Sequence, residues 1–212
     1  MPNWCENRLT VLGPKEDVAA FVDKAHGPVH QFAVSERERE WAKREGRDPD
    51  VPPRVETFSF HRLVPIPAEG LALVYHDPET ERAGAPQGHQ YEHDLWGIKW
   101  GCHDSVLVEH VDGRATYTFT TPWGPGNKFF ETLSKNWPTL AFAVSFGEEY
   151  PSRGRFVIHR GAHRATTFEH DCPLKFPEGD VSDAEEEAFR VTSNTWRDEY
   201  VRTHDKWVRD LP

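Results

Sequence analysis

The chain has 212 residues, a formal net charge of −10, and 37% hydrophobic residues that include eight tryptophans and thirteen phenylalanines. That supply of large apolar side chains is enough for a packed core, so we do not expect a disordered chain. No apolar run approaches the roughly twenty residues that cross a bilayer, and we therefore expect no membrane partner. The acidic balance disfavours nucleic acid, whose sequence-independent binding depends on Lys and Arg neutralising phosphates.

The cysteines indicate a reducing compartment. Cys5, Cys102 and Cys172 are odd in number and widely spaced, without a CxxC pair, which is atypical of a disulfide framework. The first predicted strand begins at residue 8, too early for a signal peptide to precede it. We therefore expect a cytoplasmic protein.

The first half of the chain alternates regular elements with a charged excursion. Apolar alternation predicts a strand over residues 8–12, and a stripe at helical spacing predicts a helix over residues 14–25. Residues 33–57 form a charged insertion, in which a capping-box pattern at Ser35–Glu38 opens an exposed helix before a Pro-rich linker. Residues 58–64 are expected to be extended, residues 77–88 a loop, and residues 91–96 a short helix.

The second half is patterned more regularly. Residues 105–111 and 115–121 predict a hairpin around Asp112-Gly113, followed by a helix over 127–136 and a strand over 140–146. A second hairpin is expected from 155–159 and 165–168. A long C-terminal helix over 182–212 carries an apolar stripe that is predicted to pack on the domain: Phe189, Trp196, Tyr200, Trp207 and Leu211.

The predicted fold class is α+β. Without the insertion the order is strand, helix, strand, strand, helix, strand, which is typical of a ferredoxin-like antiparallel sheet with helices on one face. We therefore expect one expanded ferredoxin-like domain over residues 1–212, with the charged insertion and the C-terminal helix as additions.

Three motifs carry a resemblance to a known family. They are Met1-Pro2-Asn3-Trp4-Cys5-Glu6-Asn7, Trp96-Gly97-Ile98-Lys99-Trp100 and Phe119-Thr120-Thr121-Pro122-Trp123-Gly124-Pro125. With them the chain resembles the YubB-like family of plasmid and phage proteins, which carry a ferredoxin-like domain. The family's second motif usually reads Trp-Gly-Thr-Lys-Trp-Asp, so Ile98 and Gly101 depart from it. The resemblance implies an accessory protein of a mobile element and carries over no catalytic residue.

The tryptophan-rich motifs supply the candidate binding residues, which are Trp96, Lys99, Trp100 and Trp123. Trp96 and Trp100 are spaced to share one face of a helical turn, where they would be core residues or an exposed aromatic anchor for a partner. Lys99 beside them would be structural or a phosphate contact.

One run resembles a metal site. His89-Gln90-Tyr91-Glu92-His93 matches the His-x-x-Glu-His pattern of zinc peptidases, with His89 and His93 as ligands and Glu92 as base. A third ligand would have to come from His103, Glu109 or His110. Chance pairs at this spacing are expected among twelve histidines, so no cofactor is predicted.

The alternation of the strands argues against base stacking on the sheet. One face is apolar, whereas the other carries mainly threonine, alanine and serine, without rings on which bases could stack. We expect the tryptophan run to cover this second face. The preferred function is a non-enzymatic binding protein whose partner is a host or mobile-element protein. The alternatives are a zinc-dependent hydrolase and a nucleic-acid-binding protein that uses a local basic patch of Arg153, Arg155, Arg160 and Arg164.

Overall fold

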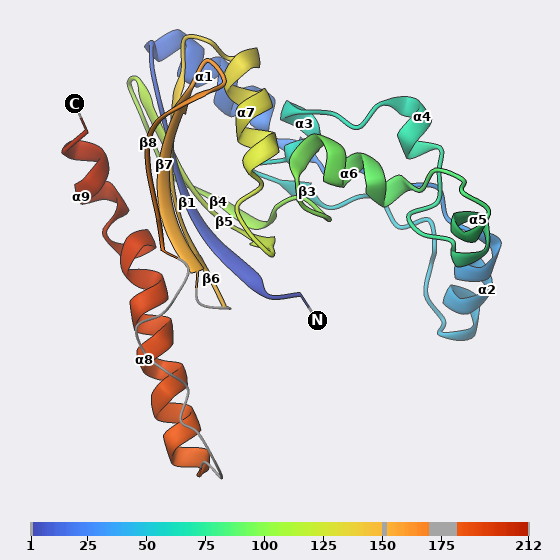
Figure 1. Cartoon of the computed structure of the whole chain (residues 1–212). Helices are drawn as coiled ribbons and strands as arrows, with labels where there is room; N and C mark the ends of the chain where they lie inside the picture. The colour runs from blue at the N-terminus through green and yellow to red at the C-terminus, as the bar shows by residue number, and fades with distance from the viewer. Residues whose placement is uncertain (1, 150–151, 170–181, 212) are drawn as a thin grey trace.

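An antiparallel sheet with strand order β4-β5-β1-β6-β7-β8 forms the centre of the molecule (Figure 1). The structure is a computed structural model that describes residues 2–149, 152–169 and 182–211; Met1 and Cys172, both used above, lie outside them. The strands are β1 (Trp4–Leu12), β4 (His103–Val111), β5 (Arg114–Pro122), β6 (Ala141–Glu148), β7 (Ser152–His159) and β8 (Ala162–Glu169). In the centre of the sheet, Leu9 of β1 lies opposite Tyr117 of β5 and Val144 of β6.

The predicted α+β fold is confirmed, and the order of its elements explains the topology. The helices α1 (Lys15–Ala25) and α7 (Asn127–Asn136) separate the strands into the series β1-α1-β4-β5-α7-β6. These four strands pair in the ferredoxin-like order β4-β5-β1-β6, and the β7-β8 hairpin extends the sheet beyond β6.

The apolar core lies between the sheet and three helices, α1, α7 and the short α3 (Phe60–Leu63) (Figure 1). Its largest group is a set of phenylalanines in which the Phe60 and Phe129 rings stack with centroids 3.6 Å apart. The prediction of an extended segment over residues 58–64 was wrong, because α3 (Phe60–Leu63) is helical there. The Ser59 hydroxyl caps this turn by accepting a hydrogen bond from the Arg62 amide, and so orients Phe60 toward Phe129.

The C-terminal segment covers the opposite face of the sheet as two helices, α8 (Asp183–Arg202) and α9 (His204–Arg209). The single predicted helix therefore breaks at Thr203, which terminates α8. It is these helices, and not the tryptophan run, that lie on the threonine-lined face, so that expectation is corrected. His204 is fully buried there, with Nε2 2.9 Å from the Thr10 hydroxyl and Nδ1 2.7 Å from the Ser145 hydroxyl.

Arginines of β7 hold α8 against the sheet. Arg153 pairs with Glu169 at 2.8 Å and Glu199 at 2.9 Å, and its guanidinium lies 4.0 Å from the centroid of the Trp196 ring. Arg155 donates to the Tyr200 carbonyl. Arg153 and Arg155, two of the four arginines proposed as a local basic patch, are thus engaged beneath the C-terminal helix.

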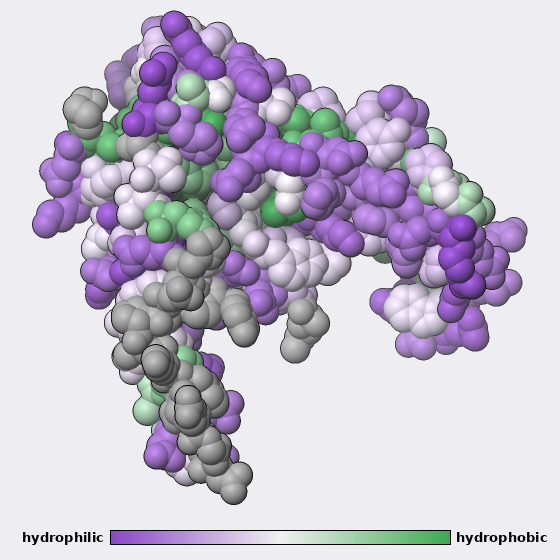
Figure 2. Space-filling view, viewed as in Figure 1, coloured by the Kyte–Doolittle hydropathy of each residue, from purple (hydrophilic) through white to green (hydrophobic). Residues whose placement is uncertain are grey.

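The segment between α1 and β4 forms a lobe beside the sheet (Figure 1). Its elements are β2 (Gly27–Pro28), α2 (Glu36–Arg44), β3 (Val55–Glu56), α3, α4 (Ala68–Leu71), α5 (Pro78–Arg82) and α6 (Gly88–Trp96). The Ser35–Glu38 capping box is present at α2, whereas the loop predicted over 77–88 contains α5. The lobe surface over α2 and α5 is predominantly hydrophilic (Figure 2), as its charged composition requires.

Cys5 and Cys102 are buried free thiols, and burial raises the pKa of each well above its usual range. Among the described residues, no helix has the length and apolar character needed to span a membrane.

Candidate functional site

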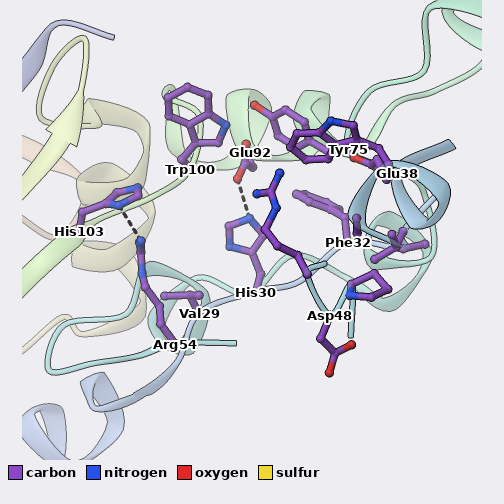
Figure 3. A pocket seen from close by; sticks show the side chains of 16 residues that line it. Val29, His30, Phe32, Glu38, Asp48, Arg54, Tyr75, Glu92, Trp100 and His103 are labelled. Atoms are coloured by element: carbon purple, nitrogen blue, oxygen red, sulfur yellow. Dashed lines mark hydrogen bonds and ion pairs between the residues drawn. The ribbon is translucent and has the colours of Figure 1, made fainter. Parts of the chain in front are cut away.

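A pocket of about 530 Å³ lies in the lobe, between α2, α6 and the start of β4 (Figure 3). Its walls include four aromatic side chains, which are Phe32, Trp41, Tyr75 and Trp100. Its ionisable lining residues are His30, Glu38, Arg47, Asp48, Arg54, Glu92 and His103, besides Tyr75. We call it the aromatic pocket. Pockets of this size with a few convergent polar groups are typical of ligand sites.

Local sequence positions Glu92 in this pocket. Gln87 and Gln90 form a capping box at the start of α6, and Gly97 ends the helix in the left-handed conformation that glycine favours. A side chain at Gly88 would meet the Phe32 ring, since a Cβ there would lie 2.6 Å from it. The helix therefore starts close against one wall of the pocket and directs Glu92 inward.

Glu92 is fully buried, and its carboxylate is only partly satisfied. Its Oε1 lies 2.6 Å from Nε2 of His30, as the dashed line in Figure 3 shows. The His30 ring is fixed by edge-to-face contacts with Trp96 and Phe32, at centroid distances of 5.0 and 4.9 Å. Neither Oε1 nor Oε2 of Glu92 has a hydrogen-bond partner among the described residues, although Oε1 lies within ion-pair distance of His30. A buried carboxylate oxygen without a donor is costly, so Oε2 can accept a hydrogen bond from a bound group.

Tyr75 and Trp100 lie beside Glu92 (Figure 3). Burial, together with the negative charge of Glu92, raises the pKa of the Tyr75 hydroxyl, while the Trp100 side chain opposes that rise. The hydroxyl therefore remains protonated, and it adds a polar group close to the carboxylate.

The opposite end of the pocket is held by a network around Arg54, in which Nε2 of His103 is buried without a hydrogen-bond partner among the described residues. Arg54 lies 3.0 Å from Glu56, 2.6 Å from Nδ1 of His103, and 2.7 Å from the Cys102 carbonyl to which it donates. Burial and the adjacent Arg54 lower the pKa of His103, which favours its neutral form. Glu56 also accepts two hydrogen bonds from Ser105, so this network ties β3 to β4 and leaves the Arg54 charge compensated.

Arg47 lines the pocket near its mouth. Its guanidinium lies 3.9 Å from the centroid of the Trp41 ring, a cation–π geometry, and no described carboxylate pairs with it. Glu38 and Asp48 are exposed acids of the same lining. The charge of Arg54 is balanced by Glu56. Among the other Asp, Glu, Lys and Arg residues of the lining there are three acids, Glu38, Asp48 and Glu92, and one base, Arg47, so the formal charge of the pocket is negative.

The structure separates the four candidate binding residues. Trp96 is fully buried and donates its indole N–H to the Val64 carbonyl, so it is a core residue here. Trp100 lies beyond the end of α6, and the shared helical face predicted for Trp96 and Trp100 is wrong. Trp100 instead packs against Trp123, with ring centroids 5.3 Å apart, and Lys99 is half-buried next to it.

Trp100 and Trp123 both have left-handed backbones, with φ of 65° and 60°. Such conformations cost energy for residues with a side chain, and they concentrate at functional sites. Trp100 lines the aromatic pocket, whereas Trp123 is 46% exposed outside it. The pair therefore links the pocket to the neighbouring surface.

The His-x-x-Glu-His run does lie on one helix, α6, but its members have separate surroundings. Nδ1 of His89 lies 2.9 Å from the Tyr75 carbonyl oxygen, His93 is exposed, and Glu92 faces His30. Among the described residues, no group of three or more His, Cys, Asp or Glu side chains is placed to hold a metal ion.

Sequence reasoning singled out Glu92 for a different role and missed His30, Tyr75 and Arg54. One feature of the sequence did indicate that Glu92 is buried. Glu92 precedes Trp96 by four residues, so on a helix the acid lies on the same face as a large apolar side chain. His30 and Tyr75 lie close to Glu92 only in the folded chain, and no local sequence pattern indicates that they do.

Comparisons with known proteins inform the fold. No family model matches the chain, and no curated protein matches it. The crystal structure of api92 from Yersinia pseudotuberculosis, of the DUF1281 family, is similar, with a TM-score of 0.54 and 12% sequence identity. The match covers 82% of this chain and all of api92. At this identity the similarity supports a common fold.

Proposed function

We propose that the chain is a non-enzymatic, cytoplasmic binding protein that acts through a protein partner, and that the aromatic pocket is where the partner binds. The observation that carries the proposal is the fully buried Glu92, whose Oε2 has no donor while it lines an accessible pocket. The resemblance to YubB-like proteins suggests that such a partner belongs to a phage, a plasmid or its host.

The composition of the pocket supports a role in binding a protein. Aromatic walls supply large contact area at low cost in side-chain entropy, as in the centres of protein interfaces. The engagement of Arg153 and Arg155 beneath α8 removes two cations from the basic patch that nucleic acid would need.

Blocking the pocket tests the proposal. Ala33 is an exposed lining residue, so Ala33→Trp fills the pocket without replacing a buried side chain. Ala83→Trp is the matched control, since Ala83 is exposed in the same lobe but lies outside the lining. Affinity capture from the native host with each variant, followed by mass spectrometry, is expected to recover a partner with wild type and Ala83→Trp but not with Ala33→Trp. Equal recovery with all three, or recovery of nucleic acid alone, would contradict the proposal.

A further inference from the structure

We infer that the group received by the aromatic pocket is a guanidinium, from an arginine exposed on the partner. The inference rests on the proposed function, because it names the chemistry by which the same pocket would recognise its protein partner.

The first argument is the hydrogen-bonding need of Glu92. Oε1 is 2.6 Å from His30, and Oε2 lacks a donor at a fully buried position. The contact with His30 is an ion-pair distance only, and no described residue makes a hydrogen bond to either carboxylate oxygen. A group that satisfies Oε2 must therefore donate hydrogen bonds, and a cation does so most strongly. A guanidinium has five N–H donors in a rigid plane and accepts none.

The second argument is the shape and chemistry of the walls. A guanidinium is flat, weakly hydrated for a cation, and stacks on aromatic faces, whereas an ammonium is a compact and strongly hydrated charge. Trp100 and Tyr75 lie beside Glu92 (Figure 3), so a donor to Oε2 would contact their rings. The chain already shows this preference, because the Arg47 guanidinium lies over the Trp41 ring at 3.9 Å.

The third argument is charge. The uncompensated acids of the lining outnumber its one uncompensated guanidinium, Arg47, and the whole chain has a formal charge of −10. Both the local and the long-range field therefore attract a basic segment and disfavour an anionic ligand. The volume of about 530 Å³ leaves room for residues that flank the arginine.

The inference is tested with small probes that differ in one property each. Capped arginine amide is the guanidinium probe, capped citrulline amide is its neutral isostere, and capped lysine amide carries the same charge on an ammonium. Guanosine monophosphate tests a nucleotide that could also donate to Glu92. Calorimetry or ligand-observed NMR on the full chain is expected to show binding of arginine about tenfold or more tighter than citrulline or lysine.

Two substitutions are expected to act in opposite directions. Glu92→Gln should weaken arginine binding by about 10- to 100-fold, because it removes the charge from the acceptor. Arg47→Ala should strengthen it severalfold, because it frees the Trp41 face and removes a like charge. Glu109→Gln is the matched control: Glu109 also pairs with a basic residue, Arg114, but lies outside the pocket. Circular dichroism reports whether each variant folds, and the comparison of probes on wild type requires no variant.

The outcomes separate this inference from the proposed function. Arginine binding that depends on Glu92 and is blocked by Ala33→Trp supports the inference. Equal binding of citrulline, or tighter binding of guanosine monophosphate, overturns it. If no probe binds but Ala33→Trp still abolishes partner capture, the guanidinium is wrong and the partner-binding pocket stands.

Discussion

The buried His204 makes a sharp prediction about stability, because it couples the docking of α9 to pH. Burial, aided by the nearby Arg8 and Arg155 and opposed by Asp205, lowers the pKa of His204 from 6.5 to about 3. Between these values the unfolded chain binds a proton at this position that the folded protein does not. The contribution of His204 to stability is therefore complete above pH about 6.5 and is lost as the pH falls toward 3.

The size of the effect follows from the shift. At pH 5, about 1.5 units below the unfolded pKa, the loss should be about 2 kcal/mol, and at pH 3 it should be about 4 kcal/mol. Urea unfolding of wild type and His204→Gln at pH 7, 6 and 5 isolates this term from all other titrating groups. The difference in free energy of unfolding between the two proteins should fall by about 2 kcal/mol from pH 7 to pH 5.

The control is His110→Gln, at an exposed position of β4, whose difference from wild type should show no comparable drift. A His204→Gln difference that stays constant over the same range would refute the reasoning. It would mean that the imidazole accepts a proton in place, between the Thr10 and Ser145 hydroxyls, without loss of the folded state.

Two further predictions concern the faces of the sheet. Phe60→Ala should lower the free energy of unfolding by about 3–5 kcal/mol in urea titrations, because Phe60 is buried and stacks on Phe129. Val191→Ala, at an exposed position, is the control. A loss for Phe60→Ala that is no larger than the loss for the control would contradict this account of the core. Arg153→Met should cost about 1–3 kcal/mol, because it leaves Glu169 and Glu199 of a partly buried network without their cation. Arg190→Met, which breaks the exposed pair with Glu187, should give no measurable change in the same assay, and equal effects of the two would show that the Arg153 network adds nothing.

The elements that were predicted correctly are those that depend on residues close together in the sequence. The helix over 127–136 has the predicted bounds, since its phenylalanines and leucine recur at helical spacing. The β4-β5 hairpin forms around Asp112-Gly113, where glycine takes a φ of 75°. Both capping boxes, at Ser35 and at Ser182, are present, because each depends on side chains three residues apart.

The failures occurred where distant contacts outweighed local pattern. Phe58-Ser59-Phe60 alternates as a strand does, yet packing of Phe60 on Phe129 and the Ser59 cap select a helical turn. Trp100 was assigned to the face of Trp96 by spacing alone, although Gly97 ends the helix between them. Trp100 packs against Trp123, and Glu92 lies beside His30. The members of each pair are far apart in the sequence, so no local periodicity could have indicated these contacts.

The candidate site stands out when the hydrogen-bond partners of the buried polar groups are compared. Glu56 and Glu92 are the buried carboxylates of the described residues. Glu56 is saturated by Arg54 and Ser105, and both ring nitrogens of buried His204 have hydroxyl partners. Glu92 alone of these three groups has an atom without a partner, and it does so in a pocket rather than in closed core. A fold that satisfies its other buried carboxylate, Glu56, and leaves Glu92 open has kept it available for a ligand's donor, because burying an unpaired carboxylate brings no stability of its own.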